Sequence, residues 1–473
     1  MRVLFVAPQP GHSQPFGIMM LSAVLKKSGH STGLVSLDQR KIEQALKKDK
    51  WDILAFSIST PSYAEAVAIC GKIRNQYNIY TIFGGPHATF SPEIIEEECI
   101  DAICRGEAEY ALVDLVEKLE KKLPVKDTLN WWVKEEGRIF KNNVRPLIED
   151  LDSLSPPDRE IAAGYDFFTS SQQGILISRG CFFNCSYCFN KIFSDLYGSG
   201  ARRVRVRSVN NVIAELKQVK LSYSPDRIAV YDDLFPVNAE WNREFCARYK
   251  SEIGLPFIVK SRPGHLTEEM TRDLKKAGCG SVIIGIEIAD EELRSRVLNR
   301  RMKNETIEDC CRMIRSYGMT LEAFILCGVP DSRIEDDLDS LEYVRKLKVD
   351  FSIVSACQPY PKTAMFENLI KAGKLDPDYK IIKVDLLPVR ESPIRFESKL
   401  HNRMIYNLVC LFPILQHTNF SIGLIKFLIK LPLGTIYFFC LKLWVGIIPR
   451  LQGKKKNVKK DILNFFIYML KTY

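Results

Sequence analysis

The chain has 473 residues, more than one hydrophobic core usually holds, which predicts two or three domains. Its hydrophobic fraction of 46% is that of a folded soluble protein, and the short apolar run at its N-terminus argues against a secretory signal. We therefore expect a cytoplasmic protein whose fourteen cysteines are free thiols and not a disulfide framework.

The net charge of +10 belongs to one part of the chain. Residues 401–473 contain eleven lysines and arginines and one aspartate, so the first 400 residues are neutral. A nucleic-acid partner is unlikely on this pattern, because no basic stripe runs through the rest of the sequence.

Residues 1–125 alternate short apolar runs with amphipathic ones, which predicts a parallel, doubly wound, Rossmann-like sheet with helices. Ligands of such sheets lie at the carboxyl ends of the strands. The candidate ligand-binding residues at these ends are Pro8, His12, Ser57, Ser59, Gly84, Gly85, Arg105 and Glu107. The alternative is that these residues only make tight turns between strands and helices.

Residues 126–173 are predicted to be a linker that contains a hairpin, WWVKEEGRIFKNN, turning at Glu136 and Gly137. The segment SPPD at 155–158 stops any helix and marks a domain boundary. From 174 to 390 a second series alternates six strands with helices, which predicts a partial (βα)6 barrel of the TIM type. Barrel active sites lie at the carboxyl ends of the strands.

Residues 391–473 are apolar, aromatic and basic, and we expect them to be mainly helical. The stretch 431–449 nearly reaches the length of a membrane span, but Pro432 begins it and Lys442 interrupts it. Interfacial helices with peripheral membrane contact are one interpretation. A hydrophobic cap on the barrel is the other.

Three cysteines, Cys181, Cys185 and Cys188, lie within the segment CFFNCSYC that follows the first barrel strand. A structural zinc site uses four ligands, and no second pair follows. A thioredoxin-like reading of CSYC leaves Cys181 unexplained. Three thiolates on a four-iron cluster leave one iron open to a substrate or cofactor.

The spacing C-x-x-x-C-x-aromatic-C in this position resembles the radical S-adenosylmethionine (radical SAM) enzymes. The resemblance implies a 4Fe-4S cluster held by the three cysteines, with SAM on the open iron. Reductive cleavage of SAM then gives a 5'-deoxyadenosyl radical that abstracts a substrate hydrogen. Tyr187 is implied to contact the adenine region, and no catalytic residue beyond the cluster is assigned.

Residues at later strand ends are implied by the same resemblance to lie near SAM: Asp232, Asp233, Lys260, Arg262, Gly285 and Glu287. Asp232 and Asp233 stand where many relatives have Gly-Gly-Glu. The alternative for Lys260 and Arg262 is that they are surface residues at a strand end and do not bind SAM. The segment PYPKT at 359–363 resembles a family PYPGT, with Lys362 in place of glycine.

The order of a doubly wound domain, a linker and a three-cysteine barrel resembles the cobalamin-dependent radical SAM subgroup. The resemblance implies cobalamin at the small residues Ser57, Ser59, Gly84 and Gly85. A D-x-H-x-x-G motif is missing, since Pro10 stands two residues before His12, so base-off, His-off binding is expected. His12 or His87 as an axial ligand is the alternative.

The function expected from this resemblance is methylation of an unactivated carbon in a small-molecule or lipid-like substrate, with flavodoxin or ferredoxin as reductant. Radical oxidation, cyclisation or rearrangement without methyl transfer is the alternative. A methylthiotransferase would need three further cluster cysteines, for which the candidates are Cys70, Cys99 and Cys104. A cobalamin or SAM sensor with a membrane-associating tail is the non-enzyme alternative.

Overall fold

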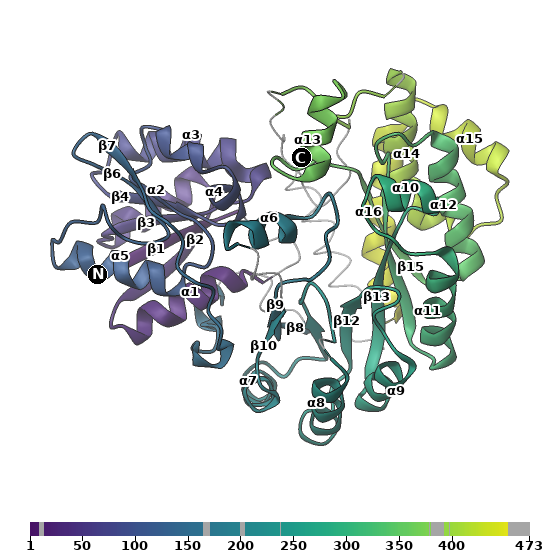
Figure 1. Ribbon diagram of the computed structural model, residues 1–473, viewed down its shortest axis with the longest axis horizontal. Helices are drawn as coiled ribbons and strands as arrows, with labels where there is room; N and C mark the ends of the chain where they lie inside the picture. The colour runs from purple at the N-terminus through teal and green to yellow at the C-terminus, as the bar shows by residue number, and fades with distance from the viewer. Residues whose placement is uncertain are drawn as a thin grey trace.

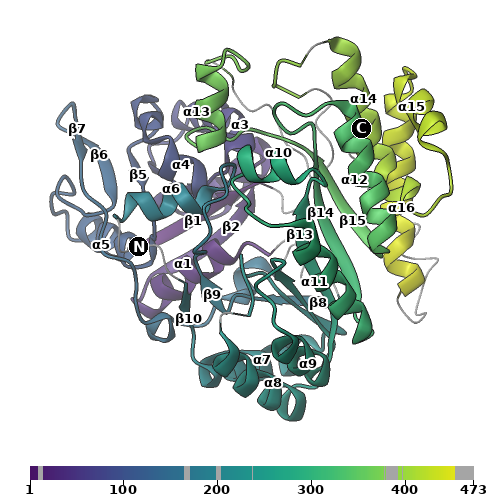
Figure 2. The ribbon, with the colours of Figure 1, turned by 45° about the vertical axis from the view of Figure 1, so that its right-hand side comes forward.

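The computed structural model describes residues 1–8, 14–163, 171–198, 204–236, 238–377, 379, 392–396 and 398–452, with side chains up to 444 in the last range. An N-terminal α/β domain lies beside an open α/β barrel. C-terminal helices cover the side of the barrel that faces away from the N-terminal domain (Figures 1 and 2). This arrangement confirms the predicted fold class.

The N-terminal sheet has the strand order β2-β1-β3-β4-β5-β6-β7. Its strands are β1 (Arg2–Ala7), β2 (Ser31–Ser36), β3 (Ile53–Ser57), β4 (Tyr80–Gly84), β5 (Ala102–Cys104), β6 (Trp131–Glu135) and β7 (Arg138–Lys141). The first five strands run parallel. Because the chain moves from β1 to opposite sides of the sheet, the topological switch point lies between β1 and β3.

Helices cover both faces of this sheet. They are α1 (Phe16–Lys27), α2 (Gln39–Lys48), α3 (Tyr63–Arg74), the short α4 (Pro86–Phe90) and α5 (Glu109–Glu120). Successive side chains of β1 point to opposite faces, so Val3 and Phe5 pack with α1 and α5, whereas Leu4 and Val6 pack with α2 and α3. The predicted doubly wound domain is confirmed.

The hairpin of β6 and β7 is antiparallel and turns at residues 136 and 137, as predicted. It also pairs with β5, so it extends the N-terminal sheet instead of standing in a linker. The physical reason is Trp131, whose buried side chain packs in the core under α5 and whose Nε1 donates to the carbonyl of Ala111 at 2.8 Å. A linker would leave this large apolar surface in water.

The barrel sheet has the order β15-β14-β13-β12-β11-β8, with all neighbours parallel. Its strands are β8 (Gln172–Ile175), β11 (Arg227–Val230), β12 (Phe257–Ser261), β13 (Cys279–Glu287), β14 (Thr320–Cys327) and β15 (Phe351–Ala356). All six predicted strands are present. The first is shorter than expected, and the chain after it forms β9 (Ser178–Arg179), which pairs antiparallel with β10 (Arg205–Val206).

The barrel helices are α6 (Phe189–Leu196), α7 (Val209–Tyr223), α8 (Ala239–Glu252), α9 (Glu268–Ala277), α10 (Glu291–Arg296), α11 (Asn304–Ser316), α12 (Ile334–Leu347) and α13 (Ala364–Lys371). Short 3-10 helices are η1 (Thr60–Ser62), η2 (Pro92–Glu96), η3 (Leu151–Ser153) and η4 (Arg159–Ala162). The outer helices α7, α8, α9, α11 and α12 form a ring around the sheet (Figure 2). Buried side chains such as Ile228 and Leu321 join the strands and these helices in one core.

The C-terminal helices are α14 (Lys399–Leu415), α15 (Ile422–Lys430) and α16 (Gly434–Gln452). Helix α14 packs against β15 and α12, and its buried side chains belong to the barrel core. Among the described residues, no single helix has the length and hydropathy to cross a membrane. Helix α15 and Gly434–Trp444 pass that test only as a pair bent by 118°.

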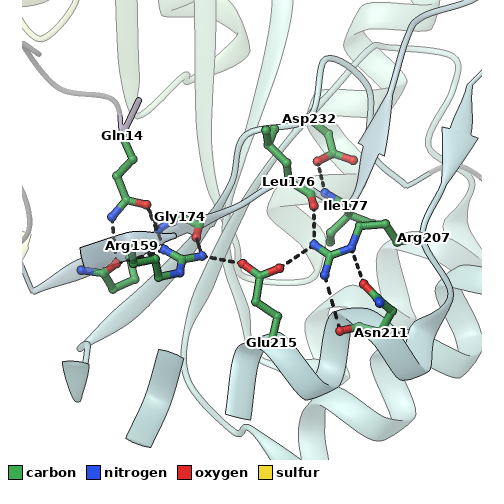
Figure 3. Close-up of polar contacts among 10 residues, drawn as sticks. Gln14, Arg159, Gly174, Leu176, Ile177, Arg207, Asn211, Glu215 and Asp232 are labelled. Atoms are coloured by element: carbon green, nitrogen blue, oxygen red, sulfur yellow. Dashed lines mark hydrogen bonds and ion pairs between the residues drawn. The ribbon is translucent and has the colours of Figure 1, made fainter. Parts of the chain in front are cut away.

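A buried polar network joins the two domains and the segment between them (Figure 3). Gln14 of the N-terminal domain donates to the side chain of Gln173 at 2.8 Å and accepts from the N–H of Gly174 at 3.1 Å. Arg159, from the connecting segment, pairs with Glu215 at 2.6 Å, and Arg207 pairs with the other oxygen of Glu215, also at 2.6 Å. The start of β8 is therefore tied to the N-terminal domain.

Candidate functional site

The three predicted cluster cysteines lie together in the loop between β9 and α6, on the side of the barrel that faces the N-terminal domain (Figure 1). Cys185 is buried, and Cys181 and Cys188 are partly buried. Burial raises the pKa of Cys181 and raises that of Cys188 to about 11, and Cys185 contributes to both increases. The three thiols therefore lie close enough to influence one another electrostatically.

The donor set fits an iron-sulfur cluster better than a single ion. The described residues include no group of three or more His, Cys, Asp or Glu placed around one metal ion. Thiolates on a cluster each bind a different iron, so their sulfur atoms need not converge on one point. Cluster binding would remove the thiol protons, since the thiolate is the ligand.

The cysteine loop is held by three hydrogen bonds to two other segments of the barrel. The N–H of Ser186 donates to the carbonyl of Leu298 at 3.0 Å, and the carbonyl of Ser186 accepts from the N–H of Met365 at 2.9 Å. Asn299 donates from Nδ2 to the carbonyl of Asn184 at 2.7 Å. The loop therefore presents its sulfur atoms from a fixed backbone, which a ligand set requires.

Two guanidinium groups flank the sulfur of Cys185. Arg262 Nη1 lies 3.6 Å and Arg300 Nη1 lies 3.7 Å from Sγ. The guanidinium of Arg262 also stacks on the ring of Phe183 at 3.8 Å. Burial, and then the like charge of Arg300, lower the pKa of Arg262. Both guanidiniums place positive charge beside this sulfur atom, which suits the negative charge of a bound cluster.

Tyr187 and Glu287 lie with Arg300 on the other side of Cys185. Arg300 Nη1 lies 3.4 Å from the Tyr187 hydroxyl and 3.6 Å from Glu287 Oε1, and its Nη2 donates to the carbonyl of Gly285 at 2.6 Å. Burial raises the pKa of Glu287, and Arg300 opposes this increase. The structure thus brings together Tyr187, Gly285 and Glu287 around Arg300, and their contact with SAM stays a prediction.

The two aspartates after β11 have different surroundings. Asp232 is buried and accepts from the N–H of Ile177 at 2.8 Å and from the hydroxyl of Ser178, so its oxygens hold the chain where it passes from β8 into β9. Burial raises its pKa to about 7. Asp233 is exposed, and its charge raises the pKa of Cys181, after the larger effect of burial. Contact with SAM stays a prediction for both residues.

Lys260 points back toward its neighbouring strand. Its Nζ donates to the carbonyl of Tyr231 at 3.1 Å and lies 5.7 Å from the ring centre of Tyr231. Burial lowers its pKa. Of the two basic residues at the end of β12, Arg262 is therefore the one that contacts the cysteine loop, while a role for Lys260 in SAM binding stays a prediction.

The sequence reading did not select Arg300. It follows α10 in a turn where Asn299 has a φ of +50°, and not at the end of a strand. A search of strand ends therefore passes over it. Its sequence signal is limited to the adjacent pair of bases Arg300 and Arg301, which does not distinguish it from a surface lysine or arginine.

The predicted cobalamin residues at the ends of β3 and β4 lie side by side. Ser57 is paired with Gly84 across the two strands. At Gly84 an added Cβ would meet no atom within 4 Å, so a large ligand has room to approach the backbone. At Gly85, with a φ of +91°, a Cβ would lie 2.6 Å from the carbonyl oxygen of Ile58. Gly85 is therefore required by the turn itself.

The other N-terminal candidates are placed less uniformly. Ser59 is exposed, and its backbone N–H donates to the hydroxyl of Ser62 at 3.1 Å. Pro8 lies at the end of β1, and His12 falls outside the described residues. His87 is buried next to the Tyr63 ring, and burial lowers its pKa to about 4. Their contacts with cobalamin remain predictions.

Arg105 and Glu107, after β5, are engaged by protein groups. Arg105 stacks on the ring of Trp132 at 5.0 Å. Glu107 accepts from two arginines of the barrel, Arg179 at 2.9 Å and Arg205 at 2.8 and 2.9 Å. Burial raises the pKa of Glu107, but the arginines outweigh this effect and the net pKa is lowered. Contact of either residue with cobalamin stays a prediction.

The three cysteines considered for a second cluster are separated by the N-terminal sheet. Cys70 and Cys99 belong to the core on one face, and Cys70 donates to the carbonyl of Cys99 at 3.1 Å. Cys104 belongs to the core on the opposite face. Three thiols on two sides of a packed sheet cannot hold one cluster, which argues against the methylthiotransferase alternative.

Comparison with known proteins assigns both domains. The family model described as the radical SAM superfamily matches residues 175–341, and the model described as the B12 binding domain matches residues 3–116. The first match runs from the end of β8 into α12 and includes the cysteine loop, and the second runs from β1 into α5.

Individual relatives share both parts of the chain. An uncharacterised methyltransferase of Pyrococcus horikoshii is 28% identical over 372 residues, which are 75% of this chain and 78% of that protein. The anaerobic magnesium-protoporphyrin IX monomethyl ester cyclase of Rubrivivax gelatinosus is 23% identical over 397 residues, 78% of this chain and 70% of the cyclase. The solved structure of the cobalamin-dependent S-adenosylmethionine radical enzyme OxsB, with aqua-cobalamin and SAM bound, has a TM-score of 0.68 at 16% identity. The structural match covers 99% of this chain and 75% of OxsB.

Proposed function

This chain belongs to the cobalamin-dependent radical SAM enzymes, and we propose that it methylates an unactivated carbon of a small-molecule or lipid-like substrate. The observation that carries the proposal is the loop of Cys181, Cys185 and Cys188 beside two buried guanidiniums, opposite a domain of the B12-binding family. Relatives named as methyltransferases support the methyl-transfer reaction.

The protein residues have distinct tasks in this proposal. Three cysteines would hold a 4Fe-4S cluster, which supplies one-electron cleavage of SAM, and cobalamin in the N-terminal domain would supply methyl transfer. Arg262 and Arg300 hold positive charge beside Cys185. Tyr187 and Glu287, which flank Arg300, are proposed to contact SAM. In this proposal the two domains together keep water away from the reacting groups.

Two products distinguish methyl transfer from the alternative. We expect the anaerobically reconstituted protein, supplied with SAM carrying an isotopically labelled methyl group, a flavodoxin or ferredoxin reductant and a substrate, to release both 5'-deoxyadenosine and S-adenosylhomocysteine and to label the substrate. The cyclase relative supports a second candidate, radical oxidation or cyclisation. Deoxyadenosine without S-adenosylhomocysteine would favour that candidate and contradict methyl transfer.

We further propose that the enzyme works in the cytoplasm at the inner face of the membrane, held by α15 and α16. Exposed apolar side chains lie at helical spacing on these helices, at Leu424 and Phe427 of α15 and at Ile436 and Phe439 of α16, and the exposed Phe420 precedes α15. The net charge of +10 in residues 401–473 favours an anionic lipid surface. In Figure 1, α15 lies at the edge of the molecule opposite the N-terminal domain.

Binding to lipid vesicles tests this placement. The double variant Leu424→Asn, Phe427→Asn should lose co-sedimentation with vesicles that contain anionic lipid, whereas Leu221→Asn should retain it. Leu221 is 85% exposed on α7 and is a matched apolar control on the barrel. Equal sedimentation of the double variant and the wild-type protein would contradict a membrane role for these helices.

A further inference from the structure

The turn after β5 of the N-terminal domain contacts β9 and β10 of the barrel, next to the cysteine loop, through a buried ion cluster. Glu107 accepts from Arg205 Nη1 and Nη2 at 2.9 and 2.8 Å, and from Arg179 Nη1 at 2.9 Å. It also accepts from the backbone N–H of Ile148 at 2.9 Å. Arg179 reaches a second carboxylate, Glu109, at 2.5 Å. Two carboxylates from one domain thus balance two guanidiniums from the other.

Burial restricts the orientations that the charged side chains of this ion cluster can adopt. The side chains of Glu107 and Arg205 are 9% and 5% exposed, so neither charge can turn to water without separating the domains. A buried ion pair adds little net stability over apolar packing, but removal of one partner leaves an unpaired buried charge. The ion cluster therefore adds little to the free energy of unfolding, but it disfavours any other arrangement of the two domains, because another arrangement would leave buried charges unpaired.

The arginines are part of the frame of the cysteine loop. Arg179 and Arg205 are paired with each other across β9 and β10. Arg179 stands two residues before Cys181, a separation of at most about 7.6 Å between Cα atoms. A shift of Arg179 relative to Glu107 would therefore move the first cluster ligand.

The same turn also contacts the chain that leaves the loop. The N–H of Glu107 donates to the hydroxyl of Tyr197, just after α6, at 2.7 Å. Gly106, with a φ of +77°, leaves space for this hydroxyl, because an added Cβ would lie 2.0 Å from it. Phe189, the first residue of α6, stacks on Phe90 of the N-terminal domain with 4.8 Å between ring centres.

We propose that Gly106 and Glu107 form a positioning element that holds β9, which leads into the cysteine loop, and the end of α6, which follows the loop, in register with the N-terminal domain. This inference rests on the proposed function, because it holds that this contact sets the distance between the proposed cluster and cobalamin. Glu107 is then a positioning residue and not a cobalamin ligand, since its carboxylate oxygens are directed to barrel arginines.

The first test is Glu107→Gln, which keeps the shape and removes the charge. We expect unchanged iron and sulfide content and unchanged cobalamin affinity. We also expect the backbone amides of the cysteine loop to exchange with solvent about tenfold faster, and the magnetic interaction between the reduced cluster and Co(II) cobalamin to weaken in the EPR spectrum. Glu252→Gln is the control, because Glu252 pairs with Arg248 and Lys217 within the barrel, at 2.7 and 2.6 Å.

A milder variant keeps the test decisive if Glu107→Gln does not fold. Tyr197→Phe removes only the hydroxyl that accepts from Glu107, and it should increase loop exchange in the same direction. Wild-type exchange and wild-type magnetic interaction in the variants would overturn the proposal, as would loss of cobalamin affinity in Glu107→Gln with loop exchange unchanged. Both readouts are independent of methyl transfer, so a wild-type protein that makes no S-adenosylhomocysteine would refute the proposed function and leave this test intact.

Discussion

Arg262 places one guanidinium nitrogen 3.6 Å from the sulfur of Cys185 while its planar group covers the ring of Phe183. Arg300 approaches the same sulfur to 3.7 Å but is also 3.6 Å from Glu287. The positive charge of Arg262 is therefore the less compensated of the two beside the proposed cluster. A positive charge favours the reduced cluster, which carries one more electron.

Replacement of this charge should change the redox potential of the cluster. We expect Arg262→Gln to shift the reduction potential to more negative values by on the order of tens of millivolts. Arg243→Gln is the control, because Arg243 pairs with Glu269 on the barrel surface. Potentiometric titration followed by EPR measures the shift. A potential equal to or above that of the wild-type protein would show that Arg262 does not act on the cluster.

Gly84 gives a separate test of the cobalamin site. Gly84→Ala adds a methyl group into open space, so thermal stability should change by less than about 0.5 kcal/mol. If cobalamin packs on this strand end, the same methyl group should reduce its affinity about tenfold or more. Spectrophotometric titration with cobalamin measures this change.

The control for Gly84 is a glycine elsewhere in the same domain. Gly71→Ala, within α3, also meets no atom within 4 Å and should bind cobalamin like the wild-type protein. Unchanged affinity in Gly84→Ala would place the cofactor away from the end of β4.

Asp337 predicts a pH dependence of stability. Its carboxyl group is fully buried at the start of α12, both oxygens accept from the N–H of Gly328 at 3.0 and 3.1 Å, and burial raises its pKa to about 8. In an unfolded chain the pKa of an aspartate is about 4. Between these values the folded chain keeps a proton that the unfolded chain releases. The free energy of unfolding should therefore fall as pH rises through this window. Asp337 contributes at most about 1.4 kcal/mol of this decrease per pH unit.

The variant Asp337→Asn should remove this contribution. Its thermal midpoint relative to the wild-type protein should increase between about pH 5 and about pH 8, because only the wild-type protein loses stability through this group. Glu252→Gln should show no such trend, because the ion pairs of Glu252 with Arg248 and Lys217 lower its pKa to about 2 and keep it ionised across this window. Parallel pH profiles of Asp337→Asn and the wild-type protein would mean that Asp337 is not protonated in the fold at neutral pH.

The features that the sequence predicted correctly depend on short-range patterns. Alternation of apolar runs placed all six barrel strands and both faces of the N-terminal sheet, and the spacing of Cys181, Cys185 and Cys188 identified the loop between β9 and α6. The hairpin was placed in a linker because its pairing with β5 depends on residues far apart in the chain.

The features that sequence reasoning missed depend on contacts between distant segments. Arg300 reaches Cys185 from a turn 115 residues later. Glu107 stands at a strand end like a ligand-binding residue, yet its partners Arg179 and Arg205 come from the other domain. Asp232 also follows a strand, but its carboxylate turns back to Ile177 and not outward. Strand-end position predicts which edge a residue occupies but not which groups its side chain contacts.

Release of 5'-deoxyadenosine is the most direct test of the account, because it requires a cluster with an iron open to SAM. The wild-type protein, reconstituted anaerobically to about four irons per chain, should release it from SAM on reduction. The variant Cys185→Ser should lose iron and release none, whereas Cys246→Ser, a buried cysteine of α8, should behave like the wild-type protein. A fully reconstituted wild-type protein that forms no deoxyadenosine, or a Cys185→Ser variant that forms as much as the wild-type protein, would contradict the proposed cluster and its chemistry.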